Sequence, residues 1–316
     1  MQLKQLAVMV SGVILTQVSL SAGALNIVLS NDDGYTSNLK AIYAKLTEDG
    51  HNVIASVPCQ NQSGKGGSIN FSDTLTTLTE ACLNDAAPAG APAFGEVNGE
   101  ENIYYVNGTP IMSLMYGLDV VAPQVWGANP KIDLVISGAN EGQNVGSIVN
   151  SSGTVGNAQF ALSRGIPAVA ISADANTTNN DELAAEVALL TSKIIKDLES
   201  KVDSQGRLLP EGYGLNINYP MFEAGDRALE LPWKVTQFGT FNAYNLKFTV
   251  NQNGSANIGF DISSTATEDQ ANDESVAYQK GFVTFTMMQH GFEGNAAAKE
   301  WLKVYMNDVS SKTDAQ

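Results

Sequence analysis

Short apolar runs alternate with amphipathic stretches from Leu25 onward, and this alternation restricts the possible folds more than any other feature of the chain. Short runs rich in Val, Ile and Leu are typical of strands buried on both faces. They are expected at Leu25–Ser30, Asn52–Val57, Ile103–Val106, Ile132–Ser137, Pro167–Ser172 and Gly214–Asn218. With amphipathic helices between them, the pattern predicts an α/β protein: a three-layer sandwich around a mostly parallel sheet.

Three helices have recognisable ends. One is expected to begin near Ser37 and stop at Gly50, a second has Thr109 as N-cap and Pro110 at its first position, and a third runs from about Asp181 to Lys201. A further helix is expected at about residues 296–308 at the C-terminal end.

Two stretches interrupt this rhythm. Residues 83–102 are rich in Ala, Pro, Gly and acidic side chains, which predicts a solvated loop. Residues 233–288 contain β-type runs at Lys247–Val250, Ile258–Ile262 and Phe282–Thr286. We expect these runs to form a β-rich extension of hairpins that projects from the main sheet and suits an oligomer interface.

Residues 1–24 have the features of a cleaved export signal. Lys4 supplies a positive start, Leu6 to Leu20 is apolar, and small residues lead up to Ala24. A membrane anchor is the alternative, but about 15 apolar residues are short against the roughly 20 that span a bilayer. We therefore expect an exported protein, periplasmic or secreted, that is cleaved near Ala24, keeps no membrane association and folds as one domain over residues 25–316.

The chain is strongly acidic. Its formal net charge is −16, and loss of Lys4 with the signal makes it −17. Such a surface repels nucleic-acid polymers, and an anionic substrate would need a local positive charge, which a metal ion could supply. Lys65 is the only Lys or Arg between Lys45 and Lys131. It is either a phosphate-steering residue or a solvated loop lysine.

The two cysteines, Cys59 and Cys82, are a disulfide candidate in an exported protein. The chain-entropy estimate for closing a loop of roughly 20 residues is about 3 kcal/mol. Two buried free thiols are the alternative.

Several hydrolase classes lack their residues. The only histidines are His51 and His290, so a Ser-His-Asp triad, a histidine nucleophile or a multi-histidine zinc site has little support. No arginine stands six positions after either cysteine, as cysteine-dependent phosphatases require. Oxygen ligands remain.

Polar side chains follow three of the predicted strands. Asp32 and Asp33 follow the first, Ser63 lies in the loop after the second, and Asn140 follows the fourth. Ligands of open α/β sheets bind at this edge, and two adjacent acids there favour a divalent cation, although Asn and Asp also stabilise ordinary turns. Thr154 is predicted to cap the next helix, whose N-terminus is suited to an anion.

Five sequence strings make the chain resemble the SurE family of survival-protein nucleotidases. They are Leu29–Gly34 (LSNDDG), Asn61–Gly64 (NQSG), Val106–Pro110 (VNGTP), Ser137–Asn144 (SGANEGQN) and Ser152–Gly156 (SGTVG). Each follows a predicted strand, in the family's order. Weaker similarity extends to about residue 288.

The resemblance implies a Rossmann-like sheet, a β-rich extension used in dimerisation and a metal-dependent phosphatase acting on nucleoside 5'- or 3'-monophosphates. It implies a divalent ion, Mg²⁺ or Mn²⁺, bound by Asp32, Asp33, Ser63 and Asn140. The phosphate subsite would contain Asn144, Ser152, Gly153 and Thr154, with Lys65 beside it, and the catalytic set would be Asp32, Asp33, Asn144 and Ser152. The expected assembly is a homodimer or a higher homo-oligomer.

The chain also departs from the family. Cys59-Gln60 replace an Asp-Arg pair that often precedes the NQSG string, and Ile111-Met112 stand where an Asp often follows GTP. These departures bear on substrate preference and spare the metal ligands. Two other functions are consistent with the residues: a non-catalytic nucleotide- or phosphate-binding protein, and a nucleoside N-glycosidic hydrolase.

Overall fold

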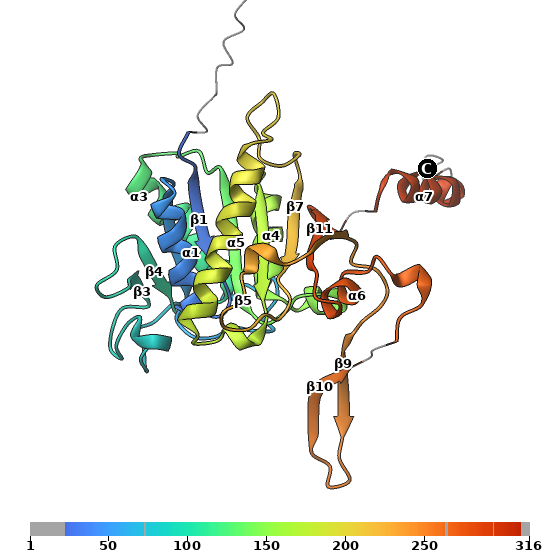
Figure 1. The fold of residues 1–316 in the computed structure, drawn as a ribbon, viewed down its shortest axis with the longest axis horizontal. Helices are drawn as coiled ribbons and strands as arrows, with labels where there is room; N and C mark the ends of the chain where they lie inside the picture. The colour runs from blue at the N-terminus through green and yellow to red at the C-terminus, as the bar shows by residue number, and fades with distance from the viewer. Residues whose placement is uncertain (1–22, 73, 263–264, 293, 311–316) are drawn as a thin grey trace, which may run out of the picture.

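The computed structural model describes residues 23–72, 74–262, 265–292 and 294–310. Within this part of the chain, nine strands form one sheet in the order β3-β4-β2-β1-β5-β6-β7-β11-β8 (Figure 1). The strands of this sheet are β1 (Asn26–Ser30), β2 (Asn52–Pro58), β3 (Phe94–Glu96), β4 (Ile103–Val106), β5 (Leu134–Glu141), β6 (Ala168–Ala173), β7 (Tyr213–Asn218), β8 (Trp233–Thr236) and β11 (Val283–Gln289).

The six predicted strands form the centre of this sheet. β4, β2, β1, β5, β6 and β7 are all parallel, so their carboxyl ends meet at one edge. β5 continues beyond its predicted end at Ser137 to Glu141, with a shift of register against β6 between Ser137 and Asn140. This extension carries Asn140 along the sheet edge.

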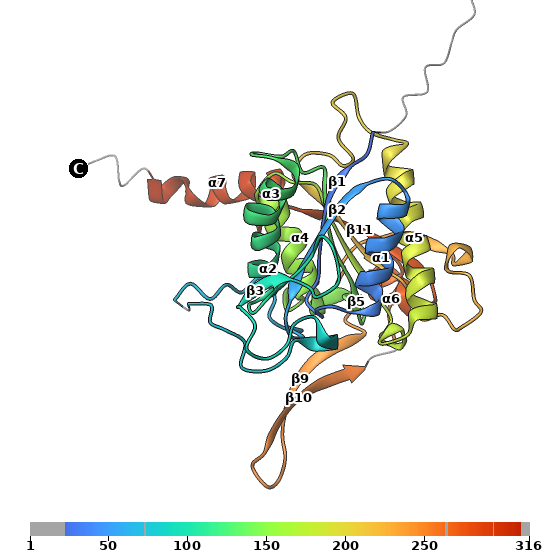
Figure 2. The same cartoon turned by 90° about the vertical axis from the view of Figure 1, so that its left-hand side faces the viewer.

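Helices cover both faces of the sheet, as predicted. They are α1 (Ser37–Glu48), α2 (Pro110–Tyr116), α3 (Ala122–Trp126), α4 (Gly153–Ser163), α5 (Asp181–Glu199), α6 (Glu274–Gln279) and α7 (Ala296–Ser310). α1 and α5 lie on one face, and α2, α3 and α4 lie on the other (Figure 2). Side chains of β1 alternate between the two cores: Ile27 and Leu29 pack with Leu39 of α1, whereas Val28 packs with Leu114 of α2. The sandwich therefore buries β1 on both faces.

Two expectations about the irregular stretches are wrong. Residues 83–102 are not only a solvated loop, because they contain β3, which pairs antiparallel with β4, and because Ala86, Ala87 and Val97 are buried in the core. The run at Phe282–Thr286 does not form a projecting hairpin. It lies in β11, which pairs antiparallel with β7 and parallel with β8 and so extends the main sheet.

One hairpin does project. β9 (Tyr244–Val250) and β10 (Ala256–Ile262) form a separate two-stranded sheet that points away from the body (Figure 1). Phe241 and Val276 pack together at its base. α7 also lies apart from the main sheet in both views.

The predicted export signal falls almost wholly on residues outside the described part of the chain. Among the residues that are described, no helix is long and apolar enough to cross a membrane.

Candidate active site

Asp32 and Asp33 directly follow β1 and are almost fully buried, with exposed fractions of 3% and 2%. The hydroxyl of Thr154, in α4, donates a hydrogen bond to Asp32 Oδ1 at 2.5 Å. Burial, followed by the charge of Asp33, raises the pKa of Asp32 to about 7. Burial also raises the pKa of Asp33. The end of β1 thus holds two acidic groups in a place where their ionised forms are poorly stabilised.

Asp33 collects donors from two neighbouring strand ends. Asn61 Nδ2 lies 2.9 Å and Ser63 Oγ 3.4 Å from Asp33 Oδ1, and the backbone N–H of Glu141 donates to Asp33 Oδ2 at 2.8 Å. The structure therefore brings the loop after β2 and the end of β5 to the acid pair, as the parallel order of these strands predicts. Ser63 itself is exposed.

Backbone hydrogen bonds fix the Ser63 loop in place. The Gln62 N–H donates to the carbonyl of Asp32 at 2.7 Å, and the Gly66 N–H donates to the carbonyl of Ser151 at 2.9 Å. The loop thus spans from the acid pair to the residue that precedes the cap of α4.

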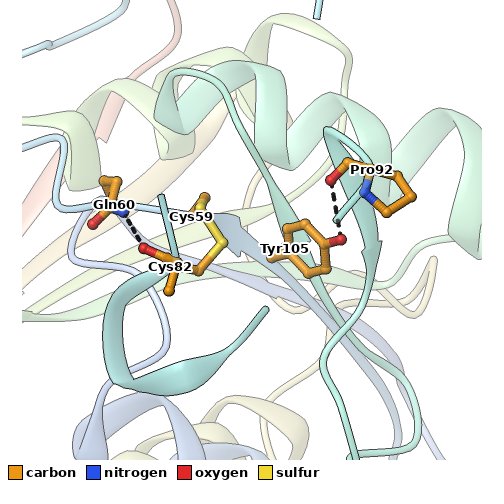
Figure 3. The surroundings of a disulfide bond; sticks show 6 residues. Cys59, Gln60, Cys82, Pro92 and Tyr105 are labelled. Carbon is orange, nitrogen blue, oxygen red and sulfur yellow. Dashed lines mark hydrogen bonds between the residues drawn. A yellow bond between two sulfur atoms is a disulfide. The ribbon is translucent and has the colours of Figure 1, made fainter. Parts of the chain in front are cut away.

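A disulfide closes the segment that contains this loop. Cys59 and Cys82 are bonded, 23 positions apart, and both are buried (Figure 3). Gln60 Nε2 donates to the carbonyl of Ala81 at 2.7 Å beside the bridge. The cysteine pair of the sequence is therefore a disulfide in the structure, at the end of β2, one residue before Gln60 and two before Asn61.

Asn140 and Glu141 contribute oxygen atoms that have no hydrogen-bond donor in the described structure. Asn140 Nδ2 donates to the Gly142 carbonyl at 2.7 Å, but Asn140 Oδ1 is buried without a partner. Glu141 Oε1 is also buried and unpartnered, and burial, followed by the charge of Asp33, raises the pKa of Glu141. Buried acceptors without donors are costly, and a cation would satisfy them.

The N-terminus of α4 lies against the acid pair. Ser152, and not Thr154 as predicted, is the N-cap, because its Oγ accepts from the Val155 N–H at 3.1 Å. Thr154 instead lies inside the helix and turns its hydroxyl to Asp32. Only glycine fits at position 153 beside Asp32, because a Cβ there would lie 2.6 Å from the Cβ of Asp32. The close approach puts the N-terminus of α4 beside the acid pair, where the backbone of Gly153 is hydrogen-bonded to Asp32.

Two predicted residues lie differently. Asn144 is buried and directs its Nδ2 to Ser172 Oγ at 2.8 Å, so its side chain is held by β6. Lys65 is exposed in the Ser63 loop, and no ion pair to its ammonium is found within the described ranges. The structure thus places Lys65 near the site without fixing its side chain.

No group of three or more His, Cys, Asp and Glu residues that could hold a metal occurs among the described residues. The predicted ligand set has only two acids, Asp32 and Asp33. Its other two ligands are the neutral oxygens of Ser63 and Asn140.

A family model described as "Survival protein SurE" matches residues 27–244. The chain belongs to the SurE family. The match includes every predicted site residue, from Asp32 to Thr154.

Known proteins are similar to the chain over different lengths. A "5'-nucleotidase SurE" of Pseudothermotoga lettingae is 29% identical over 92% of this chain and 98% of that protein. An "Acid phosphatase" of Yarrowia lipolytica is 36% identical over 62% of this chain, and the match spans 56% of that protein's length. A "5'-nucleotidase SurE" of Lawsonia intracellularis is 36% identical over 62% of this chain and 66% of that protein.

The fold agrees with a solved SurE structure. The crystal structure of the SurE protein from Aquifex aeolicus superposes with a TM-score of 0.64 at 25% identity, covering 89% of this chain and 99% of that chain. The predicted Rossmann-like fold is confirmed.

Sequence reasoning missed three contributors to the site: Glu141, the contact between Thr154 and Asp32, and the steric role of Gly153. Glu141 and Gly153 stand inside motif strings, so the signal for their position was present. The signal for their contacts was not, because it depends on how β5 and α4 approach β1.

Proposed function

We propose that the chain is a divalent-metal-dependent phosphatase that hydrolyses nucleoside 5'- or 3'-monophosphates to nucleoside and phosphate. The observation that carries this proposal is the convergence of a buried acid pair, an unpartnered Asn140 Oδ1 and the N-terminus of α4 at one sheet edge. The nucleotidase and phosphatase names of the similar proteins support the same substrate class.

Asp32, Asp33, Ser63 and Asn140 are the residues that would hold the metal ion. All four offer oxygen, the donor that Mg²⁺ and Mn²⁺ prefer. The unpartnered Asn140 Oδ1 fits this role, because a buried acceptor with no donor is the atom that a cation would satisfy. When bound, the ion would act as a Lewis acid that offsets the negative charge of the phosphoryl oxygens and lowers the pKa of a bound water.

The remaining residues would bind and orient the phosphate. The N–H groups of Gly153 and Thr154 at the start of α4 would donate to phosphoryl oxygens, with the Gly153 N–H giving up its bond to Asp32, and a helix N-terminus favours an anion. The Ser152 hydroxyl accepts from Val155, so its own proton is available for the substrate. Asn144 would act mainly by fixing this loop, since its amide is bonded to Ser172. Two roles are open to Asp32. It would either accept the proton of the attacking water, or attack phosphorus and displace the nucleoside oxygen, after which water would hydrolyse the phosphoryl-aspartate.

Phosphate-ester hydrolysis requires chiefly positioning and neutralisation of charge on the equatorial oxygens. The carboxyl edge of the sheet would provide both positioning and charge neutralisation with few reacting side chains. This matches a chain in which only His51 and His290 are available as histidines and neither lies among the site residues.

The decisive assay incubates residues 25–316 with AMP after EDTA treatment, with and without added Mn²⁺ or Mg²⁺. We expect phosphate release only with the metal. Release of adenine would favour the N-glycosidic reaction, and binding without turnover would favour a nucleotide-binding protein. Full activity in EDTA would contradict the metal assignment.

We also propose that the protein is exported and loses residues 1–24. The support is the sequence of this segment, with Lys4, an apolar run and a small-residue site before Leu25. N-terminal sequencing of the protein recovered from outside the cytoplasm should begin at Leu25, and a retained Met1 would contradict cleavage.

The β9–β10 hairpin is the proposed subunit interface. Leu246, Phe248, Val250 and Ile258 are 43–71% exposed on it, and Phe248 and Ile258 are directly opposite each other. Exposed apolar side chains grouped in this way are typical of association surfaces. Light scattering should give a dimer or larger species for the wild type and a smaller one for Phe248→Asp. A wild-type monomer would contradict the proposal.

A further inference from the structure

The loop between β5 and α4 connects Glu141 to Ser152, and residues of the β-rich extension hold it by hydrogen bonds. The Gly146 N–H donates to Glu274 Oε1 at 2.8 Å, and the Ser147 N–H donates to Asn242 Oδ1 at 2.8 Å. Gly146 has φ of +61°, and a Cβ there would lie 2.8 Å from Ser275 Oγ. The loop therefore sits directly against the extension, with no room for a larger residue.

Two asparagines of β7 hold Asn144 in the same loop. The Asn144 N–H donates to Asn218 Oδ1 at 2.7 Å, and the Asn144 carbonyl accepts from Asn216 Nδ2 at 2.9 Å and from Asn218 Nδ2 at 3.2 Å. Asn216 and Asn218 are fully buried. The backbone of Asn144 is thus fixed on both its donor and its acceptor side.

Glu274 connects these two sets of contacts. Its Oε2 accepts from Asn216 Nδ2 at 3.1 Å and from the Thr286 hydroxyl at 2.8 Å, while Oε1 holds Gly146. Asn216 Nδ2 thereby donates both of its hydrogens, one to Glu274 Oε2 and one to the Asn144 carbonyl. Asn216 Oδ1 is left buried without a partner. A buried oxygen without a donor is destabilising, but the two hydrogen bonds of Asn216 Nδ2, to Glu274 and to the Asn144 carbonyl, keep the amide in this orientation.

The carboxyl group of Glu274 accepts three hydrogen bonds, which oppose the burial that raises its pKa to about 7. Glu274 is fully buried, and its three donors are neutral groups: a backbone amide, a carboxamide and a hydroxyl. A carboxamide at position 274 would offer one acceptor and one donor. Its NH2 group would face either the Gly146 N–H or Asn216 Nδ2, so one of the two contacts to the loop would be lost. If it faced Asn216, rotation of the Asn216 amide would remove the bond to the Asn144 carbonyl.

We infer that Glu274 is a positioning residue for the phosphate subsite, acting through Asn216 and Gly146 on the loop that leads into the N-terminus of α4. This inference rests on the proposed function. Glu274 belongs to none of the five motif strings, and it joins the extension to the site through a continuous chain of buried hydrogen bonds.

The test compares Glu274→Gln with the wild type in two equilibria: inhibition by inorganic phosphate and binding of Mn²⁺. Loss of a hydrogen bond to a charged group corresponds to about a tenfold change or more. We expect the inhibition constant for phosphate to rise about tenfold and Mn²⁺ affinity to stay within about twofold, because the proposed metal ligands do not contact Glu274. Equal weakening of both would indicate general loosening and overturn the inference.

Asp49→Asn is the matched control for stability. Asp49 is a buried carboxylate bonded to Ser192, Lys45 and Lys196, and it precedes β2, at the sheet edge opposite the site. It should lower the free energy of unfolding without changing the phosphate inhibition constant. A similar rise in that constant in Asp49→Asn would show that stability alone sets it, which overturns the positioning role.

A double-mutant cycle with Asn216→Ala completes the test. If Glu274 acts in part through Asn216, the phosphate affinity lost in the double variant should be less than the sum of the two single losses, whereas independent additive losses would contradict this route. Should Glu274→Gln fail to fold, Asn216→Ala alone must still weaken phosphate and spare Mn²⁺. An inactive wild type would refute the proposed function; an active wild type with unchanged phosphate inhibition in the variants would refute only this inference.

Discussion

Two pairs of adjacent buried acids occur in the part of the chain that the structure describes, and they are held in different ways. Asp273 and Glu274 each accept hydrogen bonds from three neutral donors. Asp32 and Asp33 also have donors, Thr154 for Asp32 and Asn61, Ser63 and the Glu141 N–H for Asp33. In the described part of the chain, however, the acceptors Asn140 Oδ1 and Glu141 Oε1 near this pair have none.

The contrast teaches how to distinguish a structural acid pair from a functional one. Burial alone does not separate them, since all four carboxyl groups are at most 3% exposed. A third acid does: Glu141 lies near enough to the first pair for the charge of Asp33 to raise its pKa, and its Oε1 has no donor. The pair in the extension is supplied with donors and holds loops together, whereas the pair after β1 lies among oxygens that a cation would satisfy.

The largest expected effect is on activity at the first pair. Asp32→Asn should leave less than about a tenth of wild-type turnover, a barrier increase of at least about 1.4 kcal/mol, because it removes a negative charge from the proposed metal site. The fold should survive, since Thr154 can still donate to the amide oxygen. Thermal unfolding and AMP turnover are measured together. Turnover above a tenth would make Asp32 peripheral.

The disulfide beside the first pair is the next largest effect, and it acts on stability. Replacing Cys59 and Cys82 by serine should lower the free energy of unfolding by about 3 kcal/mol, since it releases a loop of roughly 20 residues. Guanidinium unfolding measures this. In natively exported protein, mass spectrometry without reductant should find no alkylatable thiol; two free thiols would show that the bridge does not form.

Asp273→Asn should give a smaller effect, and it should change stability and not activity, the reverse of Asp32→Asn. We expect the free energy of unfolding to fall by about 1 kcal/mol, the difference between a charged and a neutral acceptor, with turnover nearly unchanged. Hydrogen bonds from Gln237, Phe241 and Thr240 lower the pKa of Asp273 against the effect of burial. Its stabilisation is therefore present above the ordinary Asp pKa of 3.8 and lost as the pH falls through the lowered value. Urea unfolding at pH 7 and pH 3 should show the variant's deficit shrinking in acid; a constant deficit would contradict this.

The smallest expected effect concerns Lys65, the exposed cation near the first pair. Lys65→Ala should lower kcat/KM for AMP severalfold at low salt, and the deficit should shrink as ionic strength screens the field. Lys131→Ala is the control, because it removes a similarly exposed charge before β5, at the opposite sheet edge. Equal kcat/KM for Lys65→Ala and wild type at both salt concentrations would make Lys65 a plain loop residue.

Much of the first pair's surroundings was predictable from the sequence. The apolar runs located β1, β2 and β5, and parallel strands must bring their carboxyl ends together, which groups Asp32, Asp33, Ser63 and Asn140. Periodicity could not show that β11 joins the main sheet, because β11 pairs with β7 across more than 60 residues and pairing partners leave no local signal.

The contacts of Glu274 were unpredictable for the same reason. Glu274 lies far in sequence from both Gly146 and Asn216, and its role depends on hydrogen-bond geometry. The cap of α4 shows a local limit: Ser152 and Thr154 are both good N-cap residues, and only the approach of Asp32 decides that Thr154 is used elsewhere.

Equilibrium binding of Mn²⁺ tests the contrast between the two acid pairs most directly. Isothermal titration of metal-free wild type, Asp32→Asn and Asp273→Asn should give one ion per chain for the wild type, at least about tenfold weaker binding for Asp32→Asn, and unchanged binding for Asp273→Asn. Wild-type affinity in Asp32→Asn, or equal weakening in Asp273→Asn, would contradict the assignment of the metal to the pair that follows β1.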